Sequence, residues 1–255
     1  MDVTLDRSLC LGGSTHRSPC ADDQRPNGRP TADLWVVIPA FNEGQRLSQV
    51  VDDVLRVTRN VVVVDDGSTD DTRNLARHRD VWLLRHAVNL GQGAALQTGI
   101  AFAIQKGAHY VATFDADGQH CSEDLSTLLS VLIDEQAEFV LGSRFLGRAE
   151  GIPAMRRAVL RFGVLFTRVA SRVTLTDVHN GIRVMTRRGA ERLRISMNRM
   201  EHASQIVDQI AKSGMRFVEA PVTVRYTPES LAKGQRTSAA LRIGFQTLID
   251  KLVTW

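Results

Sequence analysis

The sequence predicts an α/β fold, in which a mostly parallel central sheet is covered by helices on both faces. This fold class follows from the apolar runs of the sequence and from the amphipathic segments between them. From Leu34 onward, short runs that are apolar throughout alternate with longer amphipathic segments. A strand that is apolar on both faces belongs inside a sheet, and helices between such strands are typical of right-handed parallel crossovers. The 255 residues suffice for one such domain with a small appendage.

The elements follow one another in a regular order. The run LWVVI predicts the first strand, and later runs such as VVVV and YVATF predict further strands of the same sheet. The amphipathic segments between the runs have the length and periodicity of helices. The predicted strands are 34–38, 61–64, 81–84, 110–114 and 139–142, and the predicted helices lie near 44–57, 70–78, 92–106 and 123–136.

The two ends of the chain differ from this body. Residues 1–32 mix Gly, Pro, Ser and charged residues without periodicity, which predicts a disordered N-terminal tail. We expect the folded domain to span 33–237. The pattern of 238–255 predicts an amphipathic helix at the C-terminus.

Composition and charge argue against several classes of protein. A hydrophobic fraction of 43% with 24% charged residues is that of an ordinary globular protein, and a net charge of +4 is too mild to indicate nucleic-acid binding. The three Cys residues form no CxxC, so neither a disulfide framework nor a zinc site is expected. No signal-peptide core and no apolar stretch of about 20 residues is found, which favours a cytoplasmic protein without a membrane span.

Acidic side chains follow two of the predicted strands. Asp65 and Asp66 follow the second strand, Asp115 and Asp117 follow the fourth, and Asp70 is expected to be the N-cap of the next helix. Ligands of parallel sheets bind at the carboxyl ends of the strands, and carboxylates gathered there repel one another unless a cation or hydrogen-bond donors lie among them. We therefore expect the four strand-end carboxylates to cluster in a binding site.

Asp115 and Asp117 are separated by one residue, so both carboxylates can face the same side of a tight turn. Hard oxygen ligands of this kind suit Mg²⁺ or Mn²⁺, which complete their coordination with water and substrate phosphates. Gln119 would add a neutral oxygen as a third ligand. These residues therefore predict a metal-bound diphosphate site.

The segment 89–93, NLGQG, precedes a predicted helix, whose N-terminus favours anions. The segment matches part of the dinucleotide-binding fingerprint. However, Leu96 stands where the third Gly is needed, and no acidic residue follows at the required distance. A dehydrogenase is therefore not expected.

The chain resembles the inverting family 2 glycosyltransferases in five motifs that occur in the same order. They read VVIPAFNE, VVVVDDGSTDDT, NLGQGAALQTGI, FDADGQH and VLGSRF. The nearest likeness is to the branch of the dolichol-phosphate mannose synthases and other polyprenyl-phosphate glycosyltransferases, and it covers about Leu34 to Tyr226. The resemblance implies the GT-A fold, a UDP- or GDP-sugar as donor, and metal-dependent transfer.

The resemblance also implies a nucleoside pocket, in which Asp66 would accept a hydrogen bond from a base N–H. The residues that would line this pocket are Pro39, Phe41, Glu43, Val64 and Asp66.

The family's DxD element holds ribose and diphosphate through the metal. It is matched by Asp115, Ala116 and Asp117. Gln119 matches the third metal ligand, and Arg144 and Lys233 match basic residues that approach the donor phosphates. Asp117 and Arg144 would thus act directly on the leaving group. For Arg144 an ordinary surface ion pair is the alternative.

The general base is left open. With Glu219-Ala220-Pro221 aligned to an EVP-like strand of the family, Gln205 stands where the synthases usually carry Glu. Glu201 and His202, one helical turn away, are the candidate catalytic substitutes; the alternative is that either caps a helix or faces solvent. An acceptor hydroxyl needs a base, whereas a phosphate acceptor is already anionic.

A segment at about 153–174 carries five Arg residues among Leu, Val and Phe, and its periodicity predicts a basic amphipathic helix. Related enzymes have interface helices here, before a segment similar to Asp177, Gly181 and Arg183. Two interpretations stay open. The helix attaches the protein peripherally to the cytoplasmic face of an anionic membrane that holds the acceptor, or it packs on the sheet with a solvated basic face.

Together these observations predict an enzyme. It would be a metal-dependent inverting hexosyltransferase that moves a sugar from a UDP- or GDP-sugar to a polyprenyl phosphate or lipid-linked glycan, in cell-envelope polysaccharide or glycoconjugate synthesis. The alternative is a catalytically weak relative that binds nucleotide-sugar and partners a membrane subunit. A sugar nucleotidyltransferase is disfavoured because PAFNE stands where its Gly-rich basic loop would follow the first strand.

Overall fold

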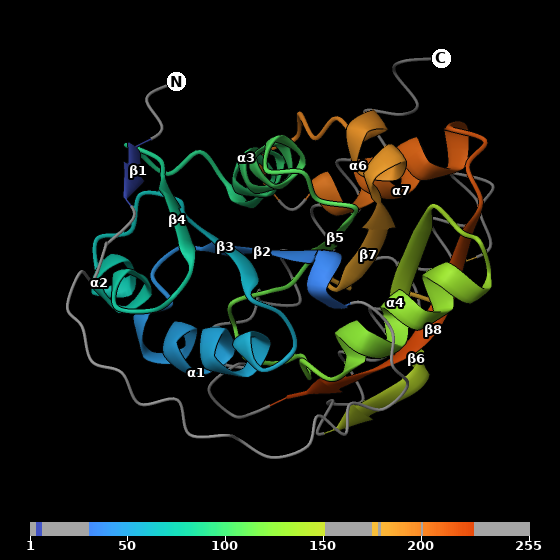
Figure 1. Cartoon of the computed structure of the whole chain (residues 1–255), viewed down its shortest axis with the longest axis horizontal. Helices are drawn as coiled ribbons and strands as arrows, with labels where there is room; N and C mark the ends of the chain where they lie inside the picture. The colour runs from blue at the N-terminus through green and yellow to red at the C-terminus, as the bar shows by residue number, and fades with distance from the viewer. Residues whose placement is uncertain (1–3, 7–30, 151–174, 178–179, 200, 227–255) are drawn as a thin grey trace, which may run out of the picture.

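The computed structural model describes residues 4–6, 31–150, 175–177, 180–199 and 201–226. The predicted helices at about 153–174 and 238–255, and Lys233, lie outside these residues. Within them the chain forms one sheet with helices packed on both faces (Figure 1).

Eight strands make up the sheet in the described part of the chain. They are β1 (Thr4–Asp6), β2 (Leu34–Ala40), β3 (Asn60–Asp65), β4 (Trp82–Arg85), β5 (Tyr110–Thr113), β6 (Phe139–Glu150), β7 (Arg183–Thr186) and β8 (Phe217–Arg225). Their order is β1-β4-β3-β2-β5-β7-β6-β8. Strands β4, β3, β2 and β5 pair in parallel, as do β6 and β8, so the predicted mostly parallel sheet is confirmed.

Two strands interrupt the parallel pattern. Strand β7 runs antiparallel between β5 and β6, and β1 runs antiparallel beside β4. Strand β7 has only four residues and begins with a charged Arg183, so it forms no apolar run in the sequence. Strand β1 comes from within the segment 1–32, which was expected to be a tail without structure.

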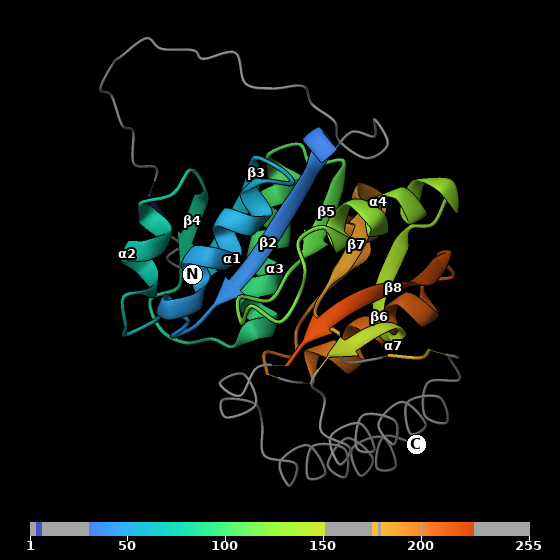
Figure 2. The same ribbon diagram turned by 90° about the horizontal axis from the view of Figure 1, so that it is seen from below.

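Six α-helices cover the two faces of the sheet in the described residues. They are α1 (Gly44–Leu55), α2 (Thr72–Arg77), α3 (Gln92–Gln105), α4 (Asp124–Asp134), α6 (Arg187–Arg192) and α7 (His202–Lys212). Figures 1 and 2 show α1 and α4 on one face and α3, α6 and α7 on the other. None of the helices in the described part is long and apolar enough to span a lipid bilayer.

The central strands are apolar throughout because both faces are covered. In β2, Leu34, Val36 and Ile38 belong to the core layer of α1 and α4, whereas Trp35 and Val37 belong to the layer of α3. Full burial of an aliphatic side chain of this size stabilises the fold by about 1.5–3 kcal/mol. Successive side chains of β2 thus point to opposite faces of the sheet, so one strand contributes to both apolar core layers.

The register of the strands brings their carboxyl ends to one edge. Ala40 at the end of β2 lies beside Asp65 at the end of β3, and Val37 lies beside Thr113 at the end of β5. The residues that follow these three strands therefore come out at the same edge of the sheet, as ligand-binding residues do in other parallel sheets.

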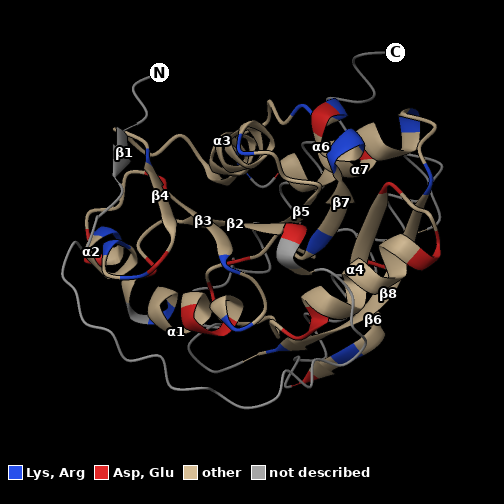
Figure 3. Ribbon diagram, viewed as in Figure 1, with Lys and Arg blue, Asp and Glu red and all other residues tan. Residues whose placement is uncertain are grey.

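Charges of both signs are interspersed on the surface of the helices. Figure 3 shows Lys or Arg positions beside Asp or Glu positions on α1 and α6. Several form local ion pairs, such as Arg79 with Asp52 and Arg187 with Glu191. Exposed pairs of this kind contribute about 0–1 kcal/mol each, so the fold depends chiefly on the two apolar layers.

Helix α3 approaches the sheet closely at Gly99. A Cβ atom at this position would lie 2.3 Å from Cγ1 of Val37 and 3.1 Å from Cγ2 of Val64. The missing side chain therefore lets α3 lie directly against β2 and β3, and extra volume here has no space to occupy.

Replacing Gly99→Ala is expected to lower the free energy of unfolding by about 1–3 kcal/mol, because overpacking forces neighbouring side chains to move. Urea unfolding measures this change. Val37→Ala removes the methyl group in contact, so the same Gly99→Ala change should cost clearly less in a Val37→Ala background. An equal cost in both backgrounds would contradict the contact.

Candidate active site

The strand-end carboxylates have different partners, and the expectation that all four gather in one binding site stays a prediction. Within the residues that the structure describes, no three His, Cys, Asp or Glu side chains converge as metal ligands do. Asp65 and Asp66 find partners in the protein, whereas Asp115 and Asp117 lie close enough to interact with one another. Asp65 and Asp66 are thus bound by other parts of the fold, whereas the charges of Asp115 and Asp117 also act on one another.

Asp66 organises the loop between β4 and α3. Its carboxylate accepts hydrogen bonds from the backbone N–H groups of Leu90, at 3.0 Å, and Gly91, at 2.7 Å. Nδ1 of His86 lies 2.7 Å from the same carboxylate, and both side chains are buried. These contacts offset the cost of burying the charge. The predicted contact of Asp66 with a nucleobase stays a prediction.

Asp65 joins the ends of two neighbouring strands. Its Oδ1 accepts a hydrogen bond from the N–H of Ser68 at 2.9 Å, and its Oδ2 lies 3.3 Å from Nε of Arg85 in β4. Both Oδ2 and this Nε are buried without a hydrogen-bond partner among the described residues. The pair is therefore held by charge attraction with poor hydrogen-bond geometry.

Asp70 ties together the starts of two helices. The N-cap of α2 is Asp71, so the prediction that Asp70 is the N-cap is wrong by one residue. The carboxylate of Asp70 accepts from the N–H of Thr72, at 3.0 Å, and from the N–H of Gly44, at 3.1 Å. It thereby satisfies an unpaired donor in the first turn of both α1 and α2.

Asp115 occupies a half-buried position beside Gly181. Nε2 of Gln92 donates to its Oδ1 at 2.9 Å, and Nε2 of His120 lies 3.5 Å from its Oδ2. A Cβ atom on Gly181 would lie 1.8 Å from this Oδ2, so a side chain at position 181 would displace the carboxylate. The predicted motif residue Gly181 therefore has a steric role.

The charge of Asp115 is stabilised by its surroundings. Burial alone would raise the pKa of Asp115, but His120, Arg183 and His202 outweigh burial and hold the pKa below its ordinary value. Asp115 is therefore ionised at neutral pH. Arg183, the first residue of β7, is itself buried and interacts electrostatically with both Asp115 and Asp177.

Asp117 has the opposite behaviour. Burial and the neighbouring charge of Asp115 raise the pKa of Asp117 to about 6. The backbone N–H of Gln119 donates to its Oδ1 at 3.0 Å and offsets only part of this effect. Two hard carboxylates that repel one another fit a divalent cation such as Mg²⁺ or Mn²⁺, which would relieve the repulsion.

The residues predicted for the nucleoside pocket differ in exposure. Phe41 is 43% exposed and available to a ligand, Glu43 is half-buried, and Pro39 and Ala116 are buried. Val64 is fully buried in the core layer beneath α3. Its side chain therefore faces α3, and the prediction that Val64 helps to form the pocket stays a prediction.

Arg144 is buried in a network of polar groups. Its Nε donates to Oδ2 of Asp177 at 2.6 Å, and its backbone N–H donates to the same oxygen at 3.1 Å. One Nη also donates to the hydroxyl of Tyr226 at the end of β8. Burial alone would lower the pKa of Arg144, but Asp177 and Tyr226 raise it above its ordinary value. The alternative of a surface ion pair is wrong, since the pair is buried.

His202 begins α7 and lies near Asp115. Its Nδ1 is 2.5 Å from the carbonyl oxygen of Arg199, and a carbonyl only accepts, so Nδ1 carries the proton and Nε2 has a free lone pair. Burial, reinforced by Arg183, lowers the pKa of His202 below its ordinary value. The ring is therefore neutral at pH 7. Glu201 is half-buried at the N-cap position of the same helix.

Gln205 binds the segment that precedes α7. Its Oε1 accepts from the N–H groups of Ser196 and Met197, each at 3.0 Å, and its Nε2 donates to Oγ of Ser196 at 2.7 Å. The amide, which stands where the resemblance leads one to expect Glu, thus holds this segment in place.

The glycines of NLGQG permit a close backbone contact. The N–H of Gly93 donates to the carbonyl oxygen of Asn198 at 3.0 Å, and a Cβ atom at Gly91 would lie 2.2 Å from that oxygen. A Cβ atom at Gly93 would lie 2.1 Å from the carbonyl oxygen of Met197. These glycines bring the segment before α7 against the start of α3.

Several site residues were not assigned a role from the sequence. Gln92 and His120 both contact Asp115, and His86 contacts Asp66. Glu219 accepts a hydrogen bond from the backbone N–H of Asp177. Gln92 belongs to the motif NLGQG and His120 to the motif FDADGQH, so their places in these motifs could have indicated a role in the site. His120 is enclosed, packs edge-on against Phe114, and its Nδ1 has no hydrogen-bond partner among the described residues.

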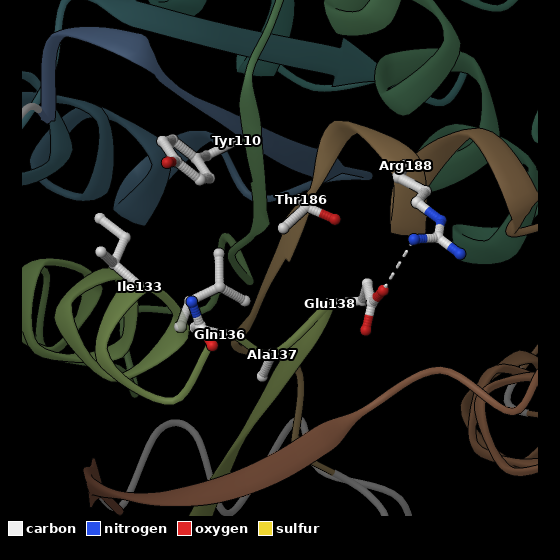
Figure 4. A pocket seen from close by; sticks show the side chains of 8 residues that line it. Tyr110, Ile133, Gln136, Ala137, Glu138, Thr186 and Arg188 are labelled. Atoms are coloured by element: carbon white, nitrogen blue, oxygen red, sulfur yellow. Dashed lines mark ion pairs between the residues drawn. The ribbon is translucent and has the colours of Figure 1, made fainter.

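One cavity lies away from this site. It has a volume of about 350 Å³ and lies between the end of α4, the first residue of β5 and the start of α6 (Figure 4). Tyr110 and Ile133 contribute to its wall, and an ion pair of 3.4 Å joins Arg188 and Glu138 at its side. This cavity is at the amino end of β5, whereas Asp115 follows the carboxyl end.

The fold is that of glycosyltransferases of the GT-A class. The structure superposes on glucosyl-3-phosphoglycerate synthase from Mycobacterium tuberculosis, solved with Mn²⁺, UDP and glucosyl-3-phosphoglycerate. The TM-score is 0.64 at 18% identity, over 86% of this chain and 79% of that one. Residues 35–194 match the model of glycosyl transferase family 2, and the chain belongs to that family. It is therefore a glycosyltransferase.

Two curated relatives match along most of their length. UDP-N-acetylglucosamine--dolichyl-phosphate N-acetylglucosaminyltransferase from Methanococcus voltae is 27% identical over 86% of this chain and 96% of its own. Polyprenol monophosphomannose synthase from Mycolicibacterium smegmatis is 28% identical over 84% of each chain.

The pKa of Asp117 predicts a pH-dependent effect of Asp117→Asn in the metal-free protein. A folded-state pKa of about 6, above the ordinary 3.8, means that the ionised carboxylate destabilises the fold at pH above about 6 and not below about 4. Asp117→Asn should therefore raise the free energy of unfolding at pH 7.5, by about 1 kcal/mol, and the gain should vanish near pH 4. Unfolding by urea in EDTA at both pH values measures this. A gain that is equal at both pH values would contradict the repulsion.

Proposed function

We propose that this glycosyltransferase is metal-dependent and inverting, and that it transfers a sugar from a UDP- or GDP-sugar to a polyprenyl phosphate or lipid-linked glycan. The observation that supports metal-dependent donor binding most strongly is the Asp115 and Asp117 pair, in which burial and the charge of Asp115 raise the pKa of Asp117 to about 6. The solved neighbour with Mn²⁺ and UDP supports the same type of donor site. The names of the relatives, which include dolichyl phosphate and polyprenol acceptors, support the lipid acceptor.

The leaving diphosphate sets the electrostatic demand on the site. When the anomeric bond breaks, negative charge grows on the nucleoside diphosphate. Asp115 and Asp117 would hold Mg²⁺ or Mn²⁺, which would supply Lewis-acid stabilisation of this charge. Gln119 is proposed as a further ligand. Arg144 adds a fixed positive charge, oriented by Asp177 before the substrate arrives. Phe41, exposed beside this edge, is proposed to contact the base.

The acceptor decides whether a base is needed. A polyprenyl phosphate attacks through an oxygen that is already anionic, so no side chain has to remove a proton. For an acceptor hydroxyl, His202 is the better candidate of the two proposed residues, because its Nε2 has a free lone pair at neutral pH. Glu201 is the alternative. A lipid acceptor further implies action at a membrane surface, and we propose that this is the cytoplasmic face.

Asp117→Asn tests the proposed donor site. The variant is expected to lose the Mn²⁺-dependent binding of UDP and to transfer sugar at least 100-fold more slowly, because charge stabilisation of the leaving group is often the largest catalytic effect. Thermal shifts with UDP, GDP and their sugars measure binding, since a ligand that binds only the folded state raises its stability. Transfer to polyprenyl phosphate measures turnover.

The matched control is Asp80→Asn, which removes an exposed carboxylate just before β4, at the opposite edge of the sheet. It should leave binding and turnover unchanged. Wild-type turnover by Asp117→Asn would exclude the metal assignment. Mn²⁺-dependent nucleotide binding without any turnover in the wild type would favour the alternative of a binding protein that partners a membrane subunit.

A further inference from the structure

Glu219 in β8 binds a short segment of backbone beside Arg144. Its two carboxylate oxygens lie 3.0 and 2.8 Å from the N–H of Thr176, and Oε1 lies 3.1 Å from the N–H of Asp177. The hydroxyl of Thr176 donates to Oε1 as well, at 2.9 Å. One half-buried carboxylate thus accepts from two successive backbone N–H groups and a side chain.

The segment that Glu219 binds belongs to no helix or strand. Residues 175–177 therefore have no ladder of backbone hydrogen bonds to fix their course. A second contact joins the hydroxyls of Ser143 in β6 and Thr176, at 2.6 Å. Glu219 is the charged member of this anchor, and charge-assisted hydrogen bonds are roughly twice as strong as neutral ones.

The anchored segment carries the side chain that orients Arg144. Asp177 is bound by Glu219 through its backbone N–H, while its Oδ2 accepts from Nε of Arg144 at 2.6 Å and from the backbone N–H of Arg144 at 3.1 Å. The position of the backbone at residue 177 therefore sets where the guanidinium lies. Hydrogen bonds thus connect Glu219 to the backbone of Asp177, and the side chain of Asp177 to Arg144.

We propose that Glu219 is a positioning residue for Arg144. It fixes residues 176 and 177 so that Asp177 presents the guanidinium of Arg144 to the diphosphate of the donor. This role rests on the proposed function, in which Arg144 meets the leaving group. Displacing a charge by about 1 Å in a site of this kind reduces the rate by up to about 100-fold.

A double-mutant cycle between Glu219→Ala and Arg144→Gln tests the coupling. Glu219→Ala is expected to lower kcat by about tenfold or more. The same change should have little further effect when Arg144 is already Gln, because the group that Glu219 positions is gone. Glu219→Gln keeps one oxygen for the backbone N–H groups and should recover most of the rate.

Glu138→Ala provides the matched control. Glu138 also accepts a hydrogen bond from a backbone N–H, that of Arg216 at 3.0 Å, but it lies beside the remote cavity of Figure 4. Its loss should lower the melting temperature without lowering kcat. This comparison separates a general loss of stability from loss of positioning.

The outcomes distinguish failure of the positioning role of Glu219 from failure of the proposed function of Arg144. If Arg144→Gln is impaired but Glu219→Ala has the wild-type kcat, or lowers kcat by the same factor in both backgrounds, the positioning role is overturned and the proposed function stands. If Arg144→Gln itself transfers sugar at the wild-type rate, the role of Arg144 in the proposed function fails, and the role of Glu219 fails with it.

Discussion

The compensation of one half-buried carboxylate, that of Asp115, is the constraint on which the geometry of the site depends. A charge in this position is costly unless donors and cations surround it, and they come from separate elements: Gln92 from α3, His120 from the loop after β5, and Arg183 from β7. Gly181 must lack a side chain for the carboxylate to fit. Strand β7 and the residue Gly181 just before it therefore bring both a compensating charge and the space for the carboxylate to the end of β5.

The acidic residues at the carboxyl edge of the sheet differ in how far the fold compensates their charges. Asp66 and Asp70 each accept two backbone hydrogen bonds, so donors within the fold compensate their carboxylates. Asp117 receives one backbone hydrogen bond and the repulsion of Asp115. The folded protein thus retains an unfavourable interaction at one point, which a bound cation can convert into binding energy.

Local patterns were sufficient to predict the strands β2, β3 and β5 and the residues that follow them, because burial on both faces leaves a continuous apolar run. Strand β7 could not be predicted in this way, since its position depends on pairing Thr186 with Tyr110, far apart in the chain. The same limit applies to the site. Motifs identified Asp66 and Arg144, but the hydrogen bonds that hold each of them come from residues distant in sequence.

The short strand β1 has a consequence for how the molecule behaves among its own copies. Without a partner, β4 would present an open row of N–H and C=O groups, on which another chain can add a strand and start aggregation. Residues 4–6 pair with Leu83, Leu84 and Arg85 and cover this row. The first residues of the chain thus protect the edge of the sheet that lies farthest from β8.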